Sequence, residues 1–155
     1  MPNSSTLLAL LIQLAVAFLA GVGTAFQPGV NSRFADLAGS RLHGGVVNFA
    51  IGLVTMLAVW ALARAEAPTA ARLAQGPWWM WIGGVLGAFF VTTAVFLVPK
   101  MGAASYLAAM IAGQLIASLA IDHFGLVGMK TVSLTPGRVL GVALIFGGML
   151  CVKFL

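Results

Sequence analysis

Two apolar runs stand in the middle of the sequence: WWMWIGGVLGAFFVTTAVFLV (residues 78–98) and MGAASYLAAMIAGQLIASLAI (residues 101–121), with Pro99 and Lys100 between them. Each run is long enough to cross a bilayer as a helix, because about 20 apolar residues span its hydrocarbon core. Two helices joined by so short a connection must be neighbours. This stretch therefore predicts an antiparallel helical hairpin within a membrane.

Three more apolar runs complete the pattern, over residues 6–27, 44–63 and 136–155. The chain is 61% hydrophobic and 7% charged, with a mean hydropathy of +1.08, whereas soluble domains carry about 25% charged residues. Most of its surface must therefore face lipid. No internal repeat or low-complexity stretch divides the sequence. We predict an all-α integral membrane protein in which residues 1–155 form a single membrane domain, a bundle of five transmembrane helices.

The connections indicate where the helices end. After the first run, Pro28 removes a backbone hydrogen bond and Gly29 loosens the chain, which predicts a broken helix at this point. Residues 32–38 then have the composition of a short interfacial extension. Thr135 followed by Pro136 is an N-cap and first-turn pair, so we expect the fifth helix to begin there.

The eight Lys and Arg residues divide evenly between the two sides of the membrane that five crossings define. A balance of four against four leaves the positive-inside rule no orientation to select. A chain of this kind inserts both ways, and two oppositely inserted copies form an inverted-repeat assembly, a common transporter architecture. The sequence therefore predicts an antiparallel homodimer. One side receives Arg64, Arg72, Lys130 and Arg138, and the other receives Arg33, Arg41, Lys100 and Lys153.

The spacings typical of zinc sites, nucleotide-binding loops and catalytic nucleophiles do not occur in this sequence. We therefore expect no enzyme activity, no metal and no cofactor. The basic residues sit singly at the ends of apolar runs, as lipid anchors do, which argues against nucleic acid as a partner. No ionisable residue lies well inside a run, so we expect no mechanism that depends on a carboxylate at mid-membrane.

Neutral polar side chains are the remaining candidates for a binding site. Gln27 and Asn31 are four residues apart at the predicted break, and Gln114 and Ser118 repeat that spacing in the fourth run. Amides at membrane depth must face protein or a wet cavity, so these groups either join helices to one another or line a path. A lining without charge suits a small polar or weakly charged solute. The candidate substrate-binding residues are Gln27, Asn31, Asn48, Tyr106, Gln114 and Ser118.

Asp122 continues the helical face of Gln114 and Ser118 just beyond the fourth run, and His123 follows it. Both residues are candidates for an interfacial gate or a proton-exchange site. The alternative is a network with Arg138 that caps the C-terminal end of the fourth helix.

The fifth run carries a line of small residues. Gly137 and Gly141 are four residues apart and Gly147 extends their line. Small residues at this spacing let two helix backbones approach closely. We therefore place the dimer interface at Gly137, Gly141 and Gly147.

A series of short motifs stands in order along nearly the whole chain. The motifs are Gln27-Pro28-Gly29-Val30-Asn31, Asn48-Phe49 with Gly52, Pro77-Trp78-Trp79 with Gly83-Gly84, Pro99-Lys100-Met101-Gly102-Ala103-Ala104, Ala112-Gly113-Gln114-Leu115, Ser118-Leu119-Ala120-Ile121-Asp122-His123-Phe124-Gly125 and Arg138-Val139-Leu140-Gly141. With these motifs, the sequence resembles the YdcZ-like five-helix proteins of the drug/metabolite transporter superfamily.

The resemblance implies a multi-pass protein of the bacterial inner (plasma) membrane, related to small multidrug exporters and to ten-helix exporters with two inverted five-helix halves. The small multidrug exporters couple transport through a carboxylate in helix one, whereas this chain has Gln13 in the comparable region. Proton-coupled export of cations by that mechanism is therefore not expected.

We expect a small-solute transporter that works by alternating access as a dual-topology homodimer, with a second copy, membrane lipid and the solute as its partners. A dual-topology channel for small ions or solutes is the second interpretation, because a narrow polar pore needs no coupling carboxylate. A lipid-handling or accessory membrane protein is the third. Saturable, exchangeable flux distinguishes a carrier from a pore.

Overall fold

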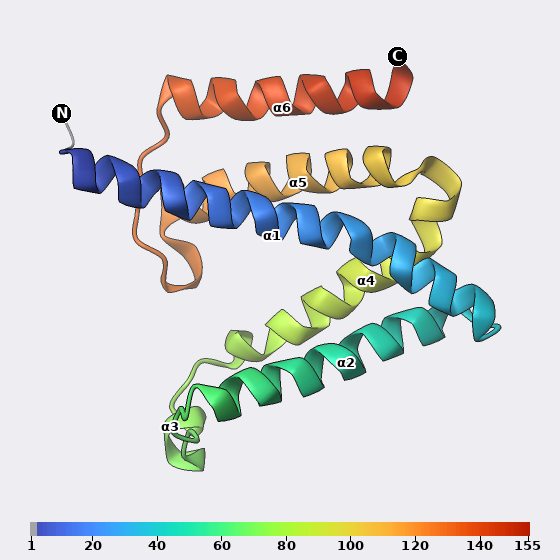
Figure 1. Cartoon of the computed structure of the whole chain (residues 1–155). Helices are drawn as coiled ribbons and strands as arrows, with labels where there is room; N and C mark the ends of the chain where they lie inside the picture. Colours follow the sequence, from blue (N-terminus) through green and yellow to red (C-terminus); the bar gives the residue numbers. More distant parts are fainter. Residues whose placement is uncertain (1–2) are drawn as a thin grey trace. The chain divides into compact units, whose positions relative to one another are not determined.

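The structure, a computed structural model, describes residues 3–155. Within this range every regular element is helical, and five helices are long and apolar enough to cross a membrane (Figure 1). The predicted all-α fold with five membrane-length helices is confirmed. The long helices are α1 (Ser4–Leu37), α2 (Arg41–Leu62), α4 (Ile82–Met101), α5 (Ala103–Phe124) and α6 (Pro136–Phe154). The short elements are α3 (Ala70–Ala74) and the 3-10 turns η1 (Trp78–Trp81), which directly precedes α4, and η2 (Leu126–Gly128).

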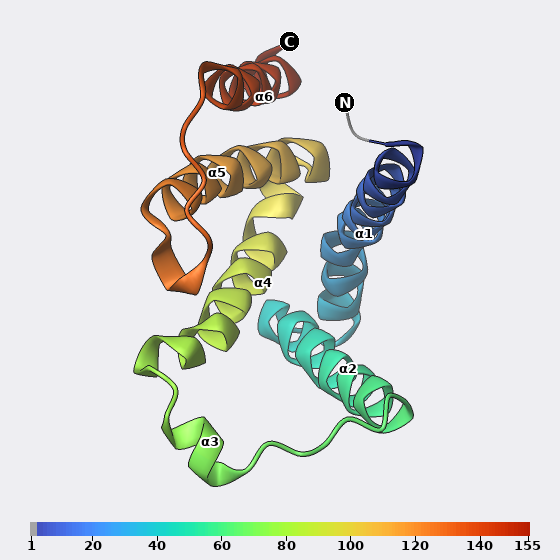
Figure 2. The same ribbon diagram turned by 90° about the vertical axis from the view of Figure 1, so that its left-hand side faces the viewer.

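The chain divides into two compact units, Met1–Pro99 and Lys100–Leu155. In the first unit, α1 and α2 run antiparallel and splay apart from the turn that joins them (Figures 1 and 2). In the second unit, α5 and α6 lie side by side and antiparallel (Figures 1 and 2). The single membrane domain and the antiparallel packing of the two central runs stay predictions.

The expected break at Pro28 is wrong, because α1 continues through this residue to Leu37. Pro28 lies almost fully buried inside the helix, and Asn31 and Ala35 on the following turns are buried as well. Packing of this segment outweighs the single hydrogen bond that proline cannot form. At 1.5 Å per residue, the 34 residues of α1 are about 51 Å long, against about 30 Å of hydrocarbon. The helix is therefore longer than one crossing needs, and the interfacial position expected for residues 32–38 stays a prediction.

The return between the two central runs lies at a different residue from the one expected. Helix α4 continues through Pro99 and Lys100 to Met101, and the chain turns at Gly102, whose φ is +84°. This conformation is open to glycine and strained for other residues. The Val95 carbonyl, four residues before Pro99, has no N–H from that proline to accept, and it accepts a hydrogen bond from Arg41 of α2.

The start of α6 is confirmed. Thr135 is the N-cap, and its hydroxyl oxygen accepts a hydrogen bond of 3.3 Å from the backbone N–H of Arg138, while Pro136 occupies the first turn.

The core of the first unit is small and lies between α1 and α4. It consists of Ala35 from α1 with Val91 and Val95 from α4, and Phe90 packs against them. Away from this core the helices present large apolar side chains outward, and Phe18 of α1, for example, is 71% exposed. In a membrane protein these faces contact lipid or other protein.

Candidate functional site

A cavity of about 310 Å³ lies between α1 and α2 in the first unit. Because α1 is continuous here, Gln27 and Asn31 fall one helical turn apart on the same face. Asn48 faces them from α2. The structure therefore brings together three of the six predicted substrate-binding residues. The cavity is lined by Gln27, Val30, Asn31 and Phe34 of α1 and by Gly44, Val47, Asn48, Ile51 and Gly52 of α2.

Gly44 determines how closely the two helices approach beside this cavity. A Cβ atom placed on Gly44 would overlap the backbone carbonyl oxygen of Asn31 and would lie 3.2 Å from the Cβ of Ala35. Only a residue without a side chain fits against the α1 backbone at this point. Gly44 thus fixes the distance between the helices that carry Asn31 and Asn48.

The three amides give the cavity its chemistry. Asn31 is only 5% exposed, whereas Gln27 and Asn48 are half-buried. Within residues 3–155 none of these three side chains forms a hydrogen bond. Their polar atoms are nevertheless not fully enclosed, because Ser32 Oγ is the one enclosed side-chain polar atom without a partner in this range. The amides therefore reach the cavity space. Each amide offers an acceptor and two donors. The cavity therefore presents neutral hydrogen-bonding groups on an apolar wall, and no charged side chain lines it.

The other three predicted substrate-binding residues lie on α5, in the second unit. Tyr106 is 7% exposed, Ser118 is half-buried and Gln114 is exposed. The Ser118 hydroxyl donates a hydrogen bond of 2.9 Å to the Leu115 carbonyl within its own helix. Within residues 3–155 the Gln114 side chain forms no hydrogen bond. Their assignment to a substrate path stays a prediction.

Asp122 takes part in the network that was the alternative to a gate. Its carboxylate forms an ion pair with Arg138 of α6, and its backbone carbonyl accepts a hydrogen bond of 2.8 Å from the N–H of Val132. Nη1 of Arg138 also donates to the carbonyls of Val132 and Ser133, at 3.3 and 3.5 Å. This clasp ties the end of α5 to the start of α6 through the loop between them.

His123 lies outside this clasp. It is exposed, and its ring contacts the neighbouring ring of Phe124 edge-on, with centroids 4.8 Å apart. A gating or proton-exchange role for Asp122 and His123 stays a prediction.

The glycines of the predicted dimer interface lie open on α6. Apart from the local backbone of α6, no atom of the second unit lies within 4 Å of a Cβ placed on Gly137, Gly141 or Gly147. These positions therefore make no close contact with α5. The interface itself stays a prediction.

Sequence reasoning missed the part that Gly44 plays in the cavity. Gly44, Asn48 and Gly52 are spaced four apart, so they share one face of α2, and all three line the cavity. Two small residues flanking a polar residue at this spacing predict a close contact between helices, with the polar side chain beside the contact.

Comparison with known proteins adds a family. A family model described as "Putative inner membrane exporter, YdcZ" matches residues 12–151. The chain is also 30% identical to "Inner membrane protein YdcZ" of Escherichia coli (strain K12) over 113 residues, which covers 72% of this chain and 76% of that protein. No solved structure matches.

Proposed function

Because the chain belongs to the YdcZ family, we propose that it exports a small polar, uncharged or weakly charged solute by alternating access, as an antiparallel dual-topology homodimer. It is a multi-pass protein of the inner membrane with five helices able to cross it. Its family is described as one of membrane exporters, which are transporters rather than enzymes.

The observation that carries the proposal is the amide-lined cavity between α1 and α2. Asn31 is buried there without a hydrogen bond in the described chain, with Gln27 and Asn48 beside it. Leaving an amide unbonded at membrane depth costs several kcal/mol, and a polar solute would supply the missing partners. No carboxylate lines the cavity, so the solute need not be a cation.

We also assign Tyr106, Gln114 and Ser118 of the second unit to substrate binding. The exposed amide of Gln114 supports this, because an unbonded amide facing lipid would be costly. We place the gate at Asp122 and His123, where the ion pair with Arg138 would break and re-form as α5 and α6 move. Channel function and lipid handling are the competing functions, and the experiment below separates them from transport.

A ligand screen followed by counterflow tests the cavity. We would purify the protein in detergent and measure its melting temperature with monosaccharides, polyols and neutral amino acids as probes. For a probe that stabilises the protein, Asn48→Leu should weaken binding about tenfold, the effect of losing one or two buried hydrogen bonds. Gln75→Leu is the matched control, because Gln75 is an exposed amide in the connection after α3 and lies outside the cavity.

Proteoliposomes then distinguish the mechanisms. A carrier should show saturable uptake of the labelled probe that accelerates when unlabelled probe is present inside. Flux that rises linearly with concentration and shows no such exchange indicates a channel. If Asn48→Leu and Gln75→Leu weaken binding equally, the α1–α2 cavity is not the substrate site. Absence of flux for every stabilising probe argues for an accessory role.

A further inference from the structure

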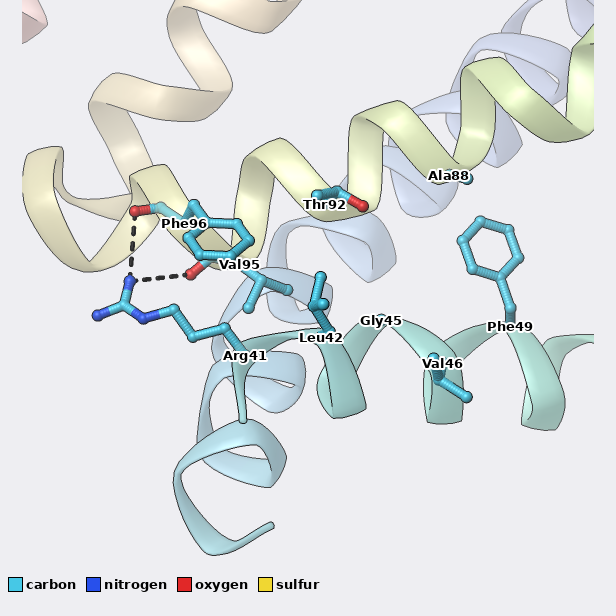
Figure 3. Close-up of a pocket in the computed structure, with 9 residues that line it drawn as sticks. All are labelled: Arg41, Leu42, Gly45, Val46, Phe49, Ala88, Thr92, Val95 and Phe96. Carbon is cyan, nitrogen blue, oxygen red and sulfur yellow. Dashed lines mark hydrogen bonds between the residues drawn. The ribbon is translucent and has the colours of Figure 1, made fainter. Parts of the chain in front are cut away.

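A second cavity, a groove of about 400 Å³, lies between α2 and α4 in the first unit (Figure 3). It shares no lining residue with the amide-lined cavity, because a different face of α2 lines it. Arg41 lies at one end, and Phe49 lies at the other end opposite Ala88 (Figure 3). Apart from Thr92, the walls between these ends are apolar. The groove therefore has one charged end and a long apolar trough.

Arg41 is held in place by α4. Pro99 has no N–H to donate to the Val95 carbonyl, and Nη1 of Arg41 lies 3.5 Å from that oxygen and 3.4 Å from the Phe96 carbonyl (Figure 3). The guanidinium also lies 5.7 Å from the centroid of the Phe96 ring. These contacts orient the guanidinium before any ligand arrives.

The charge of Arg41 is not neutralised within the described chain. Among residues 3–155 the one ion pair joins Arg138 to Asp122. Nη1 of Arg41 donates to the two carbonyls, so the N–H groups of Nε and Nη2 have no partner within residues 3–155. These two nitrogens form the edge of a guanidinium that binds a phosphate with two parallel hydrogen bonds.

We propose that this groove binds an anionic phospholipid of the surrounding membrane, with its phosphate on Arg41 and one acyl chain along the trough. Arg41 is the first residue of a membrane-spanning helix, which places it at headgroup depth. From Arg41 to Phe49 the helix rises about 12 Å into the hydrocarbon, at 1.5 Å per residue. The trough opens to the outside, since Leu42 is 57% and Phe49 is 42% exposed. A basic end joined to an apolar trough complements a lipid rather than a free solute.

Lipid binding by native mass spectrometry and by melting temperature in detergent tests this site. Phosphatidylglycerol should bind and stabilise more than phosphatidylcholine with the same acyl chains. Arg41→Gln should reduce phosphatidylglycerol binding about tenfold, as expected for loss of a charge-assisted bidentate contact. Arg41→Lys should give an intermediate loss, because it keeps the charge without the planar fork. Arg64→Gln is the control, since it removes the same charge from an exposed arginine outside the groove.

Ala88→Phe tests the trough and leaves Arg41 in place. Ala88 is exposed on the wall of the groove, so a larger side chain should fill the trough without disturbing the core. We expect it to reduce phosphatidylglycerol binding. If Arg41→Gln fails to fold, phosphatidylglycerol binding by Ala88→Phe and by Arg41→Lys tests the proposal.

Several results would overturn the proposal. Equal binding of the two lipids, or an equal loss in Arg64→Gln, would show that no specific headgroup contact exists at Arg41. Undiminished binding in Ala88→Phe would exclude the acyl chain from the trough. Stabilisation by inorganic phosphate that matches the lipid and disappears in Arg41→Gln would identify a free-anion site instead.

Discussion

Gly44 is the residue at which a single methyl group is expected to change the first unit. The carbonyl of Asn31 occupies the space that a Cβ would need, and a backbone atom cannot turn away as a flexible side chain can. We expect Gly44→Ala to lower the free energy of unfolding by about 1–3 kcal/mol, the usual cost of overpacking. Thermal unfolding in detergent, followed by circular dichroism, measures this change.

Gly45 provides the matched control on the same helix. A Cβ on Gly45 would lie 3.5 Å from Cγ1 of Val91, an ordinary van der Waals contact. Gly45→Ala should therefore be neutral or stabilising, because alanine favours a helix by about 1 kcal/mol over glycine. Equal melting temperatures for the two variants would mean that α1 and α2 do not approach closely at Gly44.

At the scale of the helices, α6 is the one long helix of the described chain without a buried residue. Its glycines make no close contact with α5, the helix that packs beside it. If this face meets a second copy, Gly141→Leu should shift the monomer–dimer equilibrium toward monomer by about tenfold or more, because leucine prevents close approach. Sedimentation in detergent measures this shift.

The control for this prediction lies on the same helix. Val139 is 50% exposed and lies on the opposite face of α6 from Gly137 and Gly141, so Val139→Ala should leave the dimer unchanged. A dimer of Gly141→Leu that is as stable as the parent would move the interface to other helices.

The length of each apolar run was enough to predict the long helices. The starts and ends of four of them lie within four residues of those expected, because membrane thickness sets how many apolar residues a span needs. The length of α1 was not predictable from local rules. Proline normally ends a helix, and what keeps α1 intact is packing around Pro28, Asn31 and Ala35 that no local pattern encodes.

The candidate site was predicted only in part, because its residues come together through packing between helices. Spacing identified Gln27 and Asn31 as one face, and a polar residue in an apolar run identified Asn48. That these residues share a cavity depends on how closely α1 and α2 approach, which Gly44 sets. The Arg41 contact with α4 joins residues more than fifty positions apart and has no local signature.

At the scale of the whole molecule, the prediction concerns the orientation of the chain in the membrane. Four basic residues on each side predict that the parent chain inserts both ways. Reporter proteins fused after Leu155 should therefore report both sides of the membrane in comparable amounts. Adding two or three lysines to the connection that contains Arg72 should fix one orientation. A strong single orientation of the parent would rule out dual topology and point to a separate partner chain.

The hydrogen bond between Arg41 and α4 predicts how two positions vary among members of the family. Proline at position 99 creates the free carbonyl of Val95, and arginine at position 41 occupies it. A relative with another residue at position 99 regains the N–H that this carbonyl lacks, so its position 41 loses one reason to remain arginine. We therefore expect positions 41 and 99 to vary together among related sequences, although they belong to different helices.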